Sequence, residues 1–237
     1  MTSPIDISFY FPDDAGGLDP DKYSPTLRRY HQLLWSKRLP DGREFDLDTD
    51  TPHCLHHKSE QVGEFYLSSD AAIHTYRDWK RTEPLLKQIP AEEINRFYRL
   101  AYSIGAMMVF PSNKIDDKMT INGARGLSRK ICDRLDLTLE CIRRHYLGGE
   151  SPLAEALDRY RDFFDLFTDF RGYTDFFLLE DLVTEERFQV KFFTDNFDDF
   201  ASTPLPRDVS TYRTYMNRSI EFVVARNQRI LAWADQL

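Results

Sequence analysis

The chain has 237 residues, of which 41% are apolar and 14% aromatic, and it carries a formal net charge of −8. This composition is sufficient for one well-buried core, and the net negative charge argues against general nucleic-acid binding. No apolar run approaches the roughly 18 residues that a membrane-spanning helix needs, and residues 1–11 lack the features of a signal peptide. We therefore expect a cytoplasmic protein without a membrane partner.

Short apolar runs in the N-terminal half predict strands separated by loops and two helices. Ser24-Pro25 is typical of a helix start, so we expect a helix from there to about Lys37. Apolar residues recur at helical spacing over residues 91–104 and predict a second helix. His53–His57 is interpreted as a loop. Strands are expected at residues 5–11, 45–47, 64–72, 105–110 and 118–122, the last two forming a hairpin.

The second half is predicted to be mostly helical. Ser151-Pro152 and Ser210 are expected helix starts, and Gly148-Gly149 an expected helix end. Helices are expected at 129–147, 151–167, 173–182 and 210–233, with an edge strand at 187–193. Together these elements predict one α+β domain over residues 1–237, in which a small mixed or antiparallel sheet packs against a mostly helical C-terminal half. The β-rich half is expected to end at about residue 125.

Charge is distributed unevenly along the chain. Residues 118–147 contain seven Lys and Arg against three acids, whereas residues 150–200 contain fourteen acids against five bases. Two interpretations remain open. The two segments neutralise each other across a packed surface, or the basic segment forms a face directed at an anion.

The strongest candidate site is the Asn122–Arg134 region, interpreted as a strand end, a glycine turn and a helix start. Glycine permits close backbone approach, and free N–H groups at a helix start favour an anion. The residues expected to bind the ligand are Asn122, Gly123, Arg125, Arg129, Lys130 and Arg134. Such a site suits a nucleotide, a nucleic-acid phosphate or a small acid, although the spacing matches neither a P-loop nor a dinucleotide fingerprint.

Two histidines are candidate catalytic proton carriers, His31 on the first helix and His57 in the histidine-bearing stretch. The alternative for His31 is a core position, and for His57 a polar loop. The spacing of His53, Cys54, His56 and His57 does not match a zinc site, so no metal site is predicted. Asp133, Asp136 and Glu140 share one helical face, where pairing with nearby arginines explains them better than Mg²⁺ binding. The odd number and wide spacing of Cys54, Cys132 and Cys141 favour reduced thiols.

Four stretches carry a family resemblance: Tyr23–Lys37, Ile121–Gly126, Asp136–Tyr146 and Asp169–Leu179. Through them the chain resembles an uncharacterised family of bacterial proteins, largely actinobacterial, over nearly its whole length. The resemblance implies a stand-alone, single-domain bacterial protein. It implies no activity, cofactor or catalytic residue.

The leading functional hypothesis is a cytoplasmic protein that binds a phosphate-bearing ligand, such as a nucleotide or nucleic acid, at the Asn122–Arg134 region. A wider version of this hypothesis adds that the protein also processes the ligand. The alternative is a non-enzymatic protein-interaction partner in a regulatory or defence pair, whose acidic segment meets a basic surface. A third hypothesis is a metal-dependent hydrolase that uses Asp133, Asp136 or the histidines. The sequence does not identify a cofactor, and it leaves open whether the protein is an enzyme.

Overall fold

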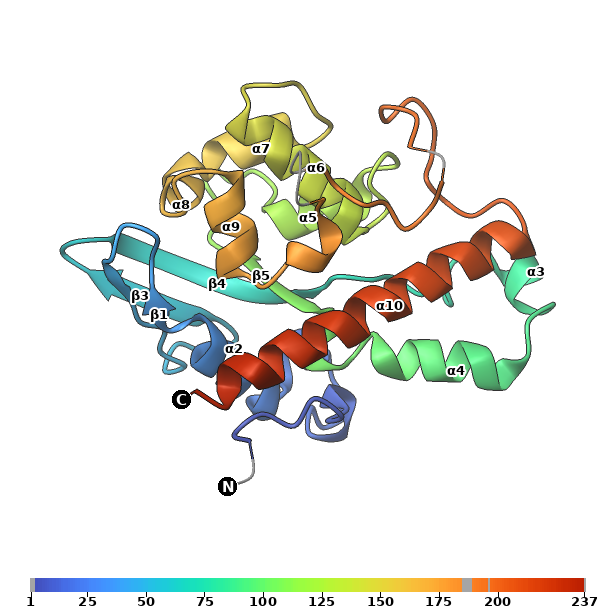
Figure 1. The fold of residues 1–237 in the computed structure, drawn as a ribbon, viewed down its shortest axis with the longest axis horizontal. Helices are drawn as coiled ribbons and strands as arrows, with labels where there is room; N and C mark the ends of the chain where they lie inside the picture. The colour runs from blue at the N-terminus through green and yellow to red at the C-terminus, as the bar shows by residue number, and fades with distance from the viewer. Residues whose placement is uncertain (1–2, 185–188, 196, 237) are drawn as a thin grey trace.

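Helices and two small antiparallel sheets alternate along the chain in the computed structural model, which describes residues 3–184, 189–195 and 197–236 (Figure 1). The elements are η1 (Phe11–Asp13), α1 (Pro20–Tyr23), α2 (Pro25–Trp35), β1 (Lys37–Arg38), β2 (Glu44–Phe45), β3 (Leu55–Ser59), β4 (Gly63–Ala71), α3 (Glu83–Leu86), α4 (Ala91–Leu100), η2 (Ile104–Ala106), β5 (Met107–Pro111), α5 (Ile121–Leu127), α6 (Leu135–Tyr146), α7 (Ala154–Arg159), α8 (Arg161–Asp165), α9 (Phe170–Phe176), η3 (Glu180–Leu182) and α10 (Val209–Ala234). The α+β class predicted from the sequence is confirmed. Within the described ranges no helix combines the length and apolar composition required to cross a bilayer.

The larger sheet has the order β3-β4-β5, and β4 pairs antiparallel with both neighbours. Leu55 faces Leu67 in one pair, and Leu67 faces Pro111 in the other. Every residue of β5 is buried, which explains its continuous apolar run Met-Met-Val-Phe. The smaller sheet is the two-residue pair of β1 and β2.

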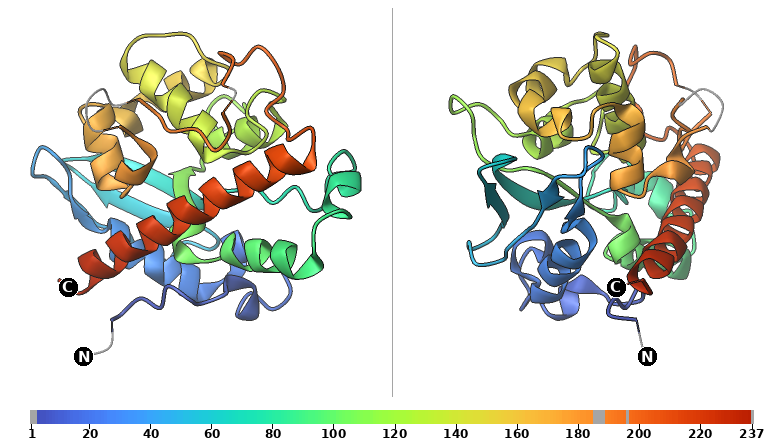
Figure 2. Two further views of the ribbon diagram at one scale, coloured as in Figure 1. Left: turned by 45° about the vertical axis from the view of Figure 1, so that its right-hand side comes forward. Right: turned by 60° about the vertical axis from the view of Figure 1, so that its left-hand side comes forward.

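The larger sheet separates two groups of helices. Helices α5 to α9 gather on one side of it, and α2 lies on the other (Figures 1 and 2). The 26-residue helix α10 crosses the molecule beside α4 and η2. Aromatic side chains fill the space between sheet and helices, including Phe110, Phe163, Tyr173 and Phe177, all buried.

One buried arginine, Arg226, joins α10 to this core. Its Nη1 donates to the carbonyl oxygens of Gly105 at 3.1 Å and Met107 at 2.7 Å, and its Nη2 donates to Phe177 O at 3.0 Å. The side chain has no solvent exposure and no ion pair with a carboxylate among the described residues. Burial lowers the pKa of Arg226 to about 10. The guanidinium is therefore held by three backbone carbonyls, together with Met108 Sδ at 3.2 Å, from segments more than forty residues away in sequence.

Several sequence expectations for the N-terminal half are wrong. Residues 5–11 form no strand, because their apolar side chains pack as an irregular segment that leads into η1. His56 and His57 lie in strand β3, not in a loop. Residues 118–122 do not pair with β5. Thr120 instead caps α5 by accepting the N–H of Gly123 at 3.3 Å, and β5 pairs with β4. The helix starting at Ser24 and the strand expected at 64–72 are confirmed by α2 and β4.

The expected long helices of the second half are interrupted. The helix predicted from residue 129 begins only at Leu135, because Cys132 and Asp133 adopt positive φ angles of 48° and 61°. Tyr160 separates α7 from α8, so residues 151–167 form two helices. Asp208, not Ser210, caps α10 through the Thr211 N–H at 2.7 Å. Part of the strand expected at 187–193 lies outside the described residues, and Val190 makes an isolated antiparallel bridge with Val183.

We expect Arg226→Met to destabilise the protein by about 3 kcal/mol or more, because three buried carbonyl oxygens lose their donor. Urea unfolding followed by circular dichroism measures the change. Arg229→Ala is the matched control on the same helix. Arg229 is 41% exposed and pairs with Asp181, so its loss should cost under about 1 kcal/mol. Equal losses for the two variants would contradict a special role for Arg226.

Candidate functional site

Arg125 is a structural residue in this fold. Its side chain is fully buried, Nη1 pairs with the carboxylate of Asp70 on β4, and Nε donates to Thr138 Oγ1 at 2.9 Å. Nη2 donates to the carbonyl oxygens of Ala71 and Asp133 at 3.2 and 3.4 Å. These contacts fix α5, β4 and the turn before α6 relative to one another. Arg125, expected from the sequence to bind a ligand, is therefore not exposed to solvent.

Arg134 is also buried and holds a segment that lies far away in sequence. Its Nε donates to Asp136 Oδ1 at 2.9 Å, and its Nη1 donates to Pro204 O at 3.2 Å. Asp136 in turn accepts the N–H of Phe193 at 2.8 Å. Burial lowers the pKa of Arg134, but the adjoining Asp136 carboxylate outweighs this effect and raises it. The guanidinium is thus permanently charged and positions the chain that contains Phe193 and Pro204.

We call residues 193–208, of which 196 lies outside the described part, the strap. The strap connects the isolated bridge at Val190 to α10 and contains no named helix or strand. Besides Arg134, Lys130 donates to Ala201 O, and Arg144 pairs with Asp199. The thiol of Cys132 lies 3.7 Å from Thr203 Oγ1, and burial raises the pKa of that thiol. The basic region recognised in the sequence therefore holds the strap in place.

A hollow of about 480 Å³ lies between the turn at residues 78–81, the turn after α5 and the strap. Three cationic side chains, Lys80, Arg81 and Arg129, line it against one carboxylate, Asp78. All three cationic residues are exposed, and none forms a hydrogen bond or ion pair through its side chain with a described residue. We call this the cationic hollow. The remaining lining comes from Trp79, Gly126, Leu127, Ser128, Cys132, Thr203 and Leu205.

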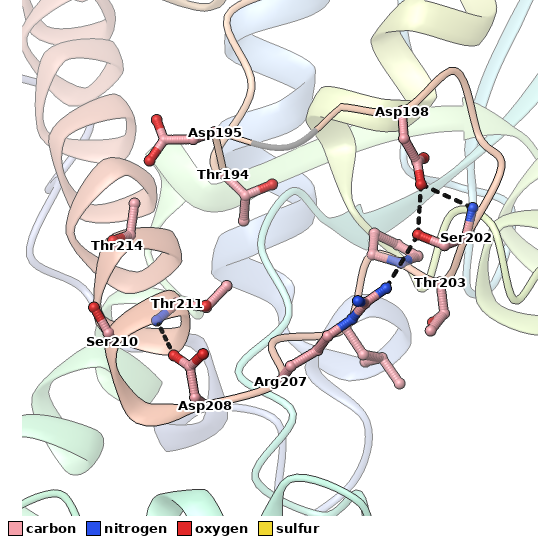
Figure 3. Close-up of a pocket in the computed structure, with 12 residues that line it drawn as sticks. Thr194, Asp195, Asp198, Ser202, Thr203, Arg207, Asp208, Ser210, Thr211 and Thr214 are labelled. Carbon is pink, nitrogen blue, oxygen red and sulfur yellow. Dashed lines mark hydrogen bonds between the residues drawn. The ribbon is translucent and has the colours of Figure 1, made fainter.

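A second hollow, of about 420 Å³, lies between the strap and the first turns of α10 (Figure 3). Six hydroxyl side chains line it together with three carboxylates and Arg207, so we call it the hydroxyl hollow. Asp208 and Thr211 lie on one side of it, and Asp198 and Ser202 on the other. The hydroxyl-bearing lining residues are Thr194, Ser202, Thr203, Ser210, Thr211 and Thr214, and the acidic ones are Asp195, Asp198 and Asp208.

The two hollows adjoin. Thr203 and Leu205 of the strap line both of them. In Figures 1 and 2 the strap, α3 and the start of α10 lie at the same end of the molecule. Because Arg134 donates to Pro204, it positions the strap residue between these two shared lining residues. The arrangement offers one region with unpaired positive charge next to one rich in hydroxyl groups.

The other residues expected to bind a ligand have different positions. Asn122 lies in the first turn of α5, where its Nδ2 donates to Ser68 Oγ at 3.2 Å, and its buried Oδ1 has no partner. A Cβ at Gly123 would lie 2.7 Å from Met119 Cγ, so a larger residue there would displace the Met119 side chain. The N–H of Gly123 is used by the Thr120 cap. The Gly123 amide is therefore not available to an anion.

His31 lies in a directed chain of buried hydrogen bonds. Trp35 Nε1 donates to His31 Nδ1 at 2.9 Å, so the neutral ring carries its hydrogen on Nε2, which lies 3.0 Å from Ser69 Oγ. Burial, with a contribution from Arg226, lowers the pKa of His31 to about 3. The ring therefore donates to Ser69 and cannot accept the hydroxyl proton of Ser69. His31 thus occupies a core position, which was the alternative interpretation from the sequence.

His57 stacks on Phe45 with ring centroids 4.4 Å apart. Its Nδ1 lies 2.7 Å from Asp46 O, which requires the hydrogen on that nitrogen, and its Nε2 lies 3.2 Å from Ser59 Oγ. Both ring nitrogens of each candidate histidine thus have partners within the fold. Neither histidine lines the two hollows.

The basic and acidic segments touch at two described ion pairs, Lys118 with Glu155 and Arg144 with Asp199. Glu140 pairs with Arg143 and Arg144 on its own helix, as its spacing predicted. In the part of the chain that the structure describes, no three His, Cys, Asp or Glu side chains are grouped so that they could hold a metal ion.

Lys80, Arg81 and the hydroxyl-bearing residues of the hydroxyl hollow were not identified from the sequence. The sequence contains one local signal for Lys80 and Arg81. They directly follow Trp79, so an aromatic residue lies beside two cations. The hydroxyl residues are scattered over residues 194–214 without a motif. Only the folded path of the strap against α10 brings them together.

Comparison with protein families assigns the chain to one of them. The model of a family of unknown function, DUF6994, matches residues 5–230, so the chain belongs to this family. The resemblance to an uncharacterised family seen in the sequence is confirmed. No curated protein and no solved structure matches the chain.

The carboxyl group of Asp21, near Ser69, gives a testable pH dependence. Burial, reinforced by Asp19, raises the pKa of Asp21 from 3.8 to about 6, and Oδ1 has no hydrogen-bond partner. Because the pKa of Asp21 is higher in the folded state than in the unfolded state, the folded state binds the proton more tightly. The free energy of unfolding that this proton contributes is fully present below pH 4 and is lost as the pH rises through 6. We expect Asp21→Asn to stabilise the protein by about 1–3 kcal/mol above pH 7 and to have little effect at pH 4. Thermal midpoints measured between pH 4 and 8 test this, and a difference that does not change with pH would contradict it.

Proposed function

We propose that this member of the family binds a small phosphate-bearing ligand, such as a nucleotide, in the cationic hollow. We place this activity in the bacterial cytoplasm, where the three cysteines, none of which forms a disulfide, would stay reduced. The proposal keeps the anion chemistry inferred from the sequence. It moves the ligand from the start of α5 to the turn after its end, where Arg129 meets Lys80 and Arg81.

The observation that carries the proposal is the free positive charge in this hollow. Most arginines of the basic region already have carboxylate partners, as Arg125 does in Asp70 and Arg134 in Asp136. Lys80, Arg81 and Arg129 have none among the described residues, although they share one concave surface. Guanidinium and ammonium groups form charge-assisted hydrogen bonds with phosphate oxygens. A volume of about 480 Å³ is in the range of small-molecule sites.

The other residues predicted to bind the ligand have supporting roles in this proposal. Arg134 and Lys130 hold the strap that forms one wall. Arg125 fixes α5, which ends at the hollow, and Gly126 lines it directly. Asn122 and Gly123 act only through the packing of α5.

Binding, and not catalysis, is the function proposed here. The hydrogen bonds of His31 and His57 engage both rings inside the fold. A proton-carrier role for either histidine stays a prediction from the sequence. It would require a substrate to displace one of these contacts.

An interaction with a basic protein is the second candidate. The observation that favours it is the exposed acidic surface of α8 and its neighbouring turns. Asp162, Asp165 and Asp169 are exposed there and form no ion pair with a described residue. A regulatory or defence partner with a basic surface would complement this charge. Stable co-purification of a basic protein, lost when Asp162 and Asp165 are replaced by Asn, would support this alternative.

For the leading proposal we expect the triple variant Lys80→Ala/Arg81→Ala/Arg129→Ala to bind phosphate and adenosine monophosphate at least tenfold more weakly than the wild type. Each lost charge-assisted hydrogen bond costs about 1.5 kcal/mol or more. Isothermal titration calorimetry measures the affinities. The thermal midpoint should change little, because the three side chains are exposed and have no ion-pair partners to leave behind.

Arg96→Ala is the matched control for this experiment. Arg96 is an exposed arginine of α4 that also has no described ion pair, but it lines a different groove. Its replacement should leave the affinities unchanged. Unaltered affinity in the triple variant, or equal weakening in the control, would rule out the cationic hollow as the binding site.

A further inference from the structure

The hydroxyl hollow has a chemistry that a phosphate site does not need. Its lining contains six hydroxyl side chains and three carboxylates, all from residues 194–214. Two of the hydroxyl groups, those of Ser210 and Thr214 on α10, form no hydrogen bond with a described residue. Ser202 and Thr211, by contrast, already interact with Asp198 and Asp208. Free hydroxyl groups next to carboxylates supply both donors and acceptors, as the hydroxyl groups of a neutral polar ligand require.

The local charge disfavours an anionic group in this second hollow. Asp195, Asp198 and Asp208 line it against Arg207, and only Asp195 has a further cationic partner among the described residues, Arg218, whereas the adjoining cationic hollow has three cations against Asp78. The amide groups at the start of α10 do not offer an anion site either, because Asp208 accepts the N–H of Thr211. A ligand that reaches across Thr203 and Leu205 must therefore be anionic at one end and neutral but rich in hydroxyl groups at the other.

We propose that the ligand is a phosphorylated sugar, with its phosphate in the cationic hollow and its sugar hydroxyl groups in the hydroxyl hollow. This inference rests on the proposed function and specifies its ligand class. Sugar hydroxyl groups donate to the carboxylates of Asp208 and of Asp195, whose other oxygen accepts from Arg218, and they accept from Ser210 and Thr214. About 420 Å³ accommodates one sugar ring. Thr203, which lines both hollows, lies where the phosphate ester joins the sugar.

The same charges disfavour a nucleic-acid strand. A strand carries one phosphate for every nucleotide, so its next phosphate would approach the carboxylates of the hydroxyl hollow. A free sugar phosphate and a nucleoside monophosphate share the phosphorylated sugar and satisfy both hollows. Comparison of the two ligands identifies which one the protein prefers.

The test is titration calorimetry of the full chain with inorganic phosphate, ribose 5-phosphate, adenosine monophosphate and a short oligonucleotide. The wild type should bind ribose 5-phosphate at least tenfold more tightly than inorganic phosphate. In the double variant Ser210→Ala/Thr214→Val this preference should fall about tenfold, because two hydrogen bonds to the sugar are lost. Its affinity for inorganic phosphate should not change.

A second variant removes a carboxylate without removing the cap of α10. Asp208→Ser keeps an oxygen that can accept the Thr211 N–H, so the helix start is preserved. We expect it to weaken ribose 5-phosphate binding by about fivefold to tenfold and to leave inorganic phosphate binding intact or slightly stronger. Thermal midpoints of the variants confirm that they are folded.

The outcomes separate this inference from the proposed function. Binding of inorganic phosphate without any preference for ribose 5-phosphate, or with a preference that both variants retain, overturns the sugar assignment and leaves phosphate binding in place. Tighter binding of the oligonucleotide than of either monophosphate also overturns it. Absence of phosphate binding overturns both. Adenosine monophosphate binding that weakens in the variants identifies the sugar as part of a nucleotide.

Discussion

Buried guanidinium groups are the constraint on which the rest of this structure depends. Arg125, Arg134 and Arg226 have at most 1% exposure, and each joins segments that are distant in sequence. A buried charge is costly unless its donors find acceptors, so each arginine fixes the positions of the carbonyl and side-chain oxygen atoms that accept from it. Arg226 does so without a carboxylate partner, through Gly105, Met107 and Phe177. Irregular segments can therefore occupy defined positions in a fold with few strands.

The candidate site follows from this internal framework. Arg134 and Asp136 hold the strap from the inside, through Pro204 and the Phe193 N–H. The outer surface of the strap then closes one side of two hollows. Lys80, Arg81 and Arg129 have no ion-pair partner among the described residues and share one of these hollows. Within the basic region, the buried cations Arg125 and Arg134 thus build the site, whereas the exposed Arg129 faces it together with Lys80 and Arg81.

Sequence reasoning identified local features and failed where tertiary contacts decide. Ser24-Pro25 and the alternating residues before Ala71 determine their own conformation, so α2 and β4 could be predicted. The periodic apolar stripe from residue 129 predicted a longer helix than α6. It could not indicate that Arg125 binds the carbonyl of Asp133, in a turn where Cys132 and Asp133 both have positive φ. Clustering of basic residues correctly drew attention to this region. It could not distinguish Arg125, which pairs with Asp70 fifty-five residues away, from Arg129, which has no such partner.

The strap has a consequence for local unfolding. Because no helix or strand forms in its described residues, its attachment depends on side-chain contacts, including those from Arg134, Lys130, Arg144 and Arg218. Its backbone amides should therefore exchange with solvent hydrogen faster than those of β4, which are paired on both sides. Opening of the strap would dismantle both hollows while the sheet and the aromatic core stay intact. A bound ligand that contacts both hollows would then slow this exchange without altering the exchange of the core.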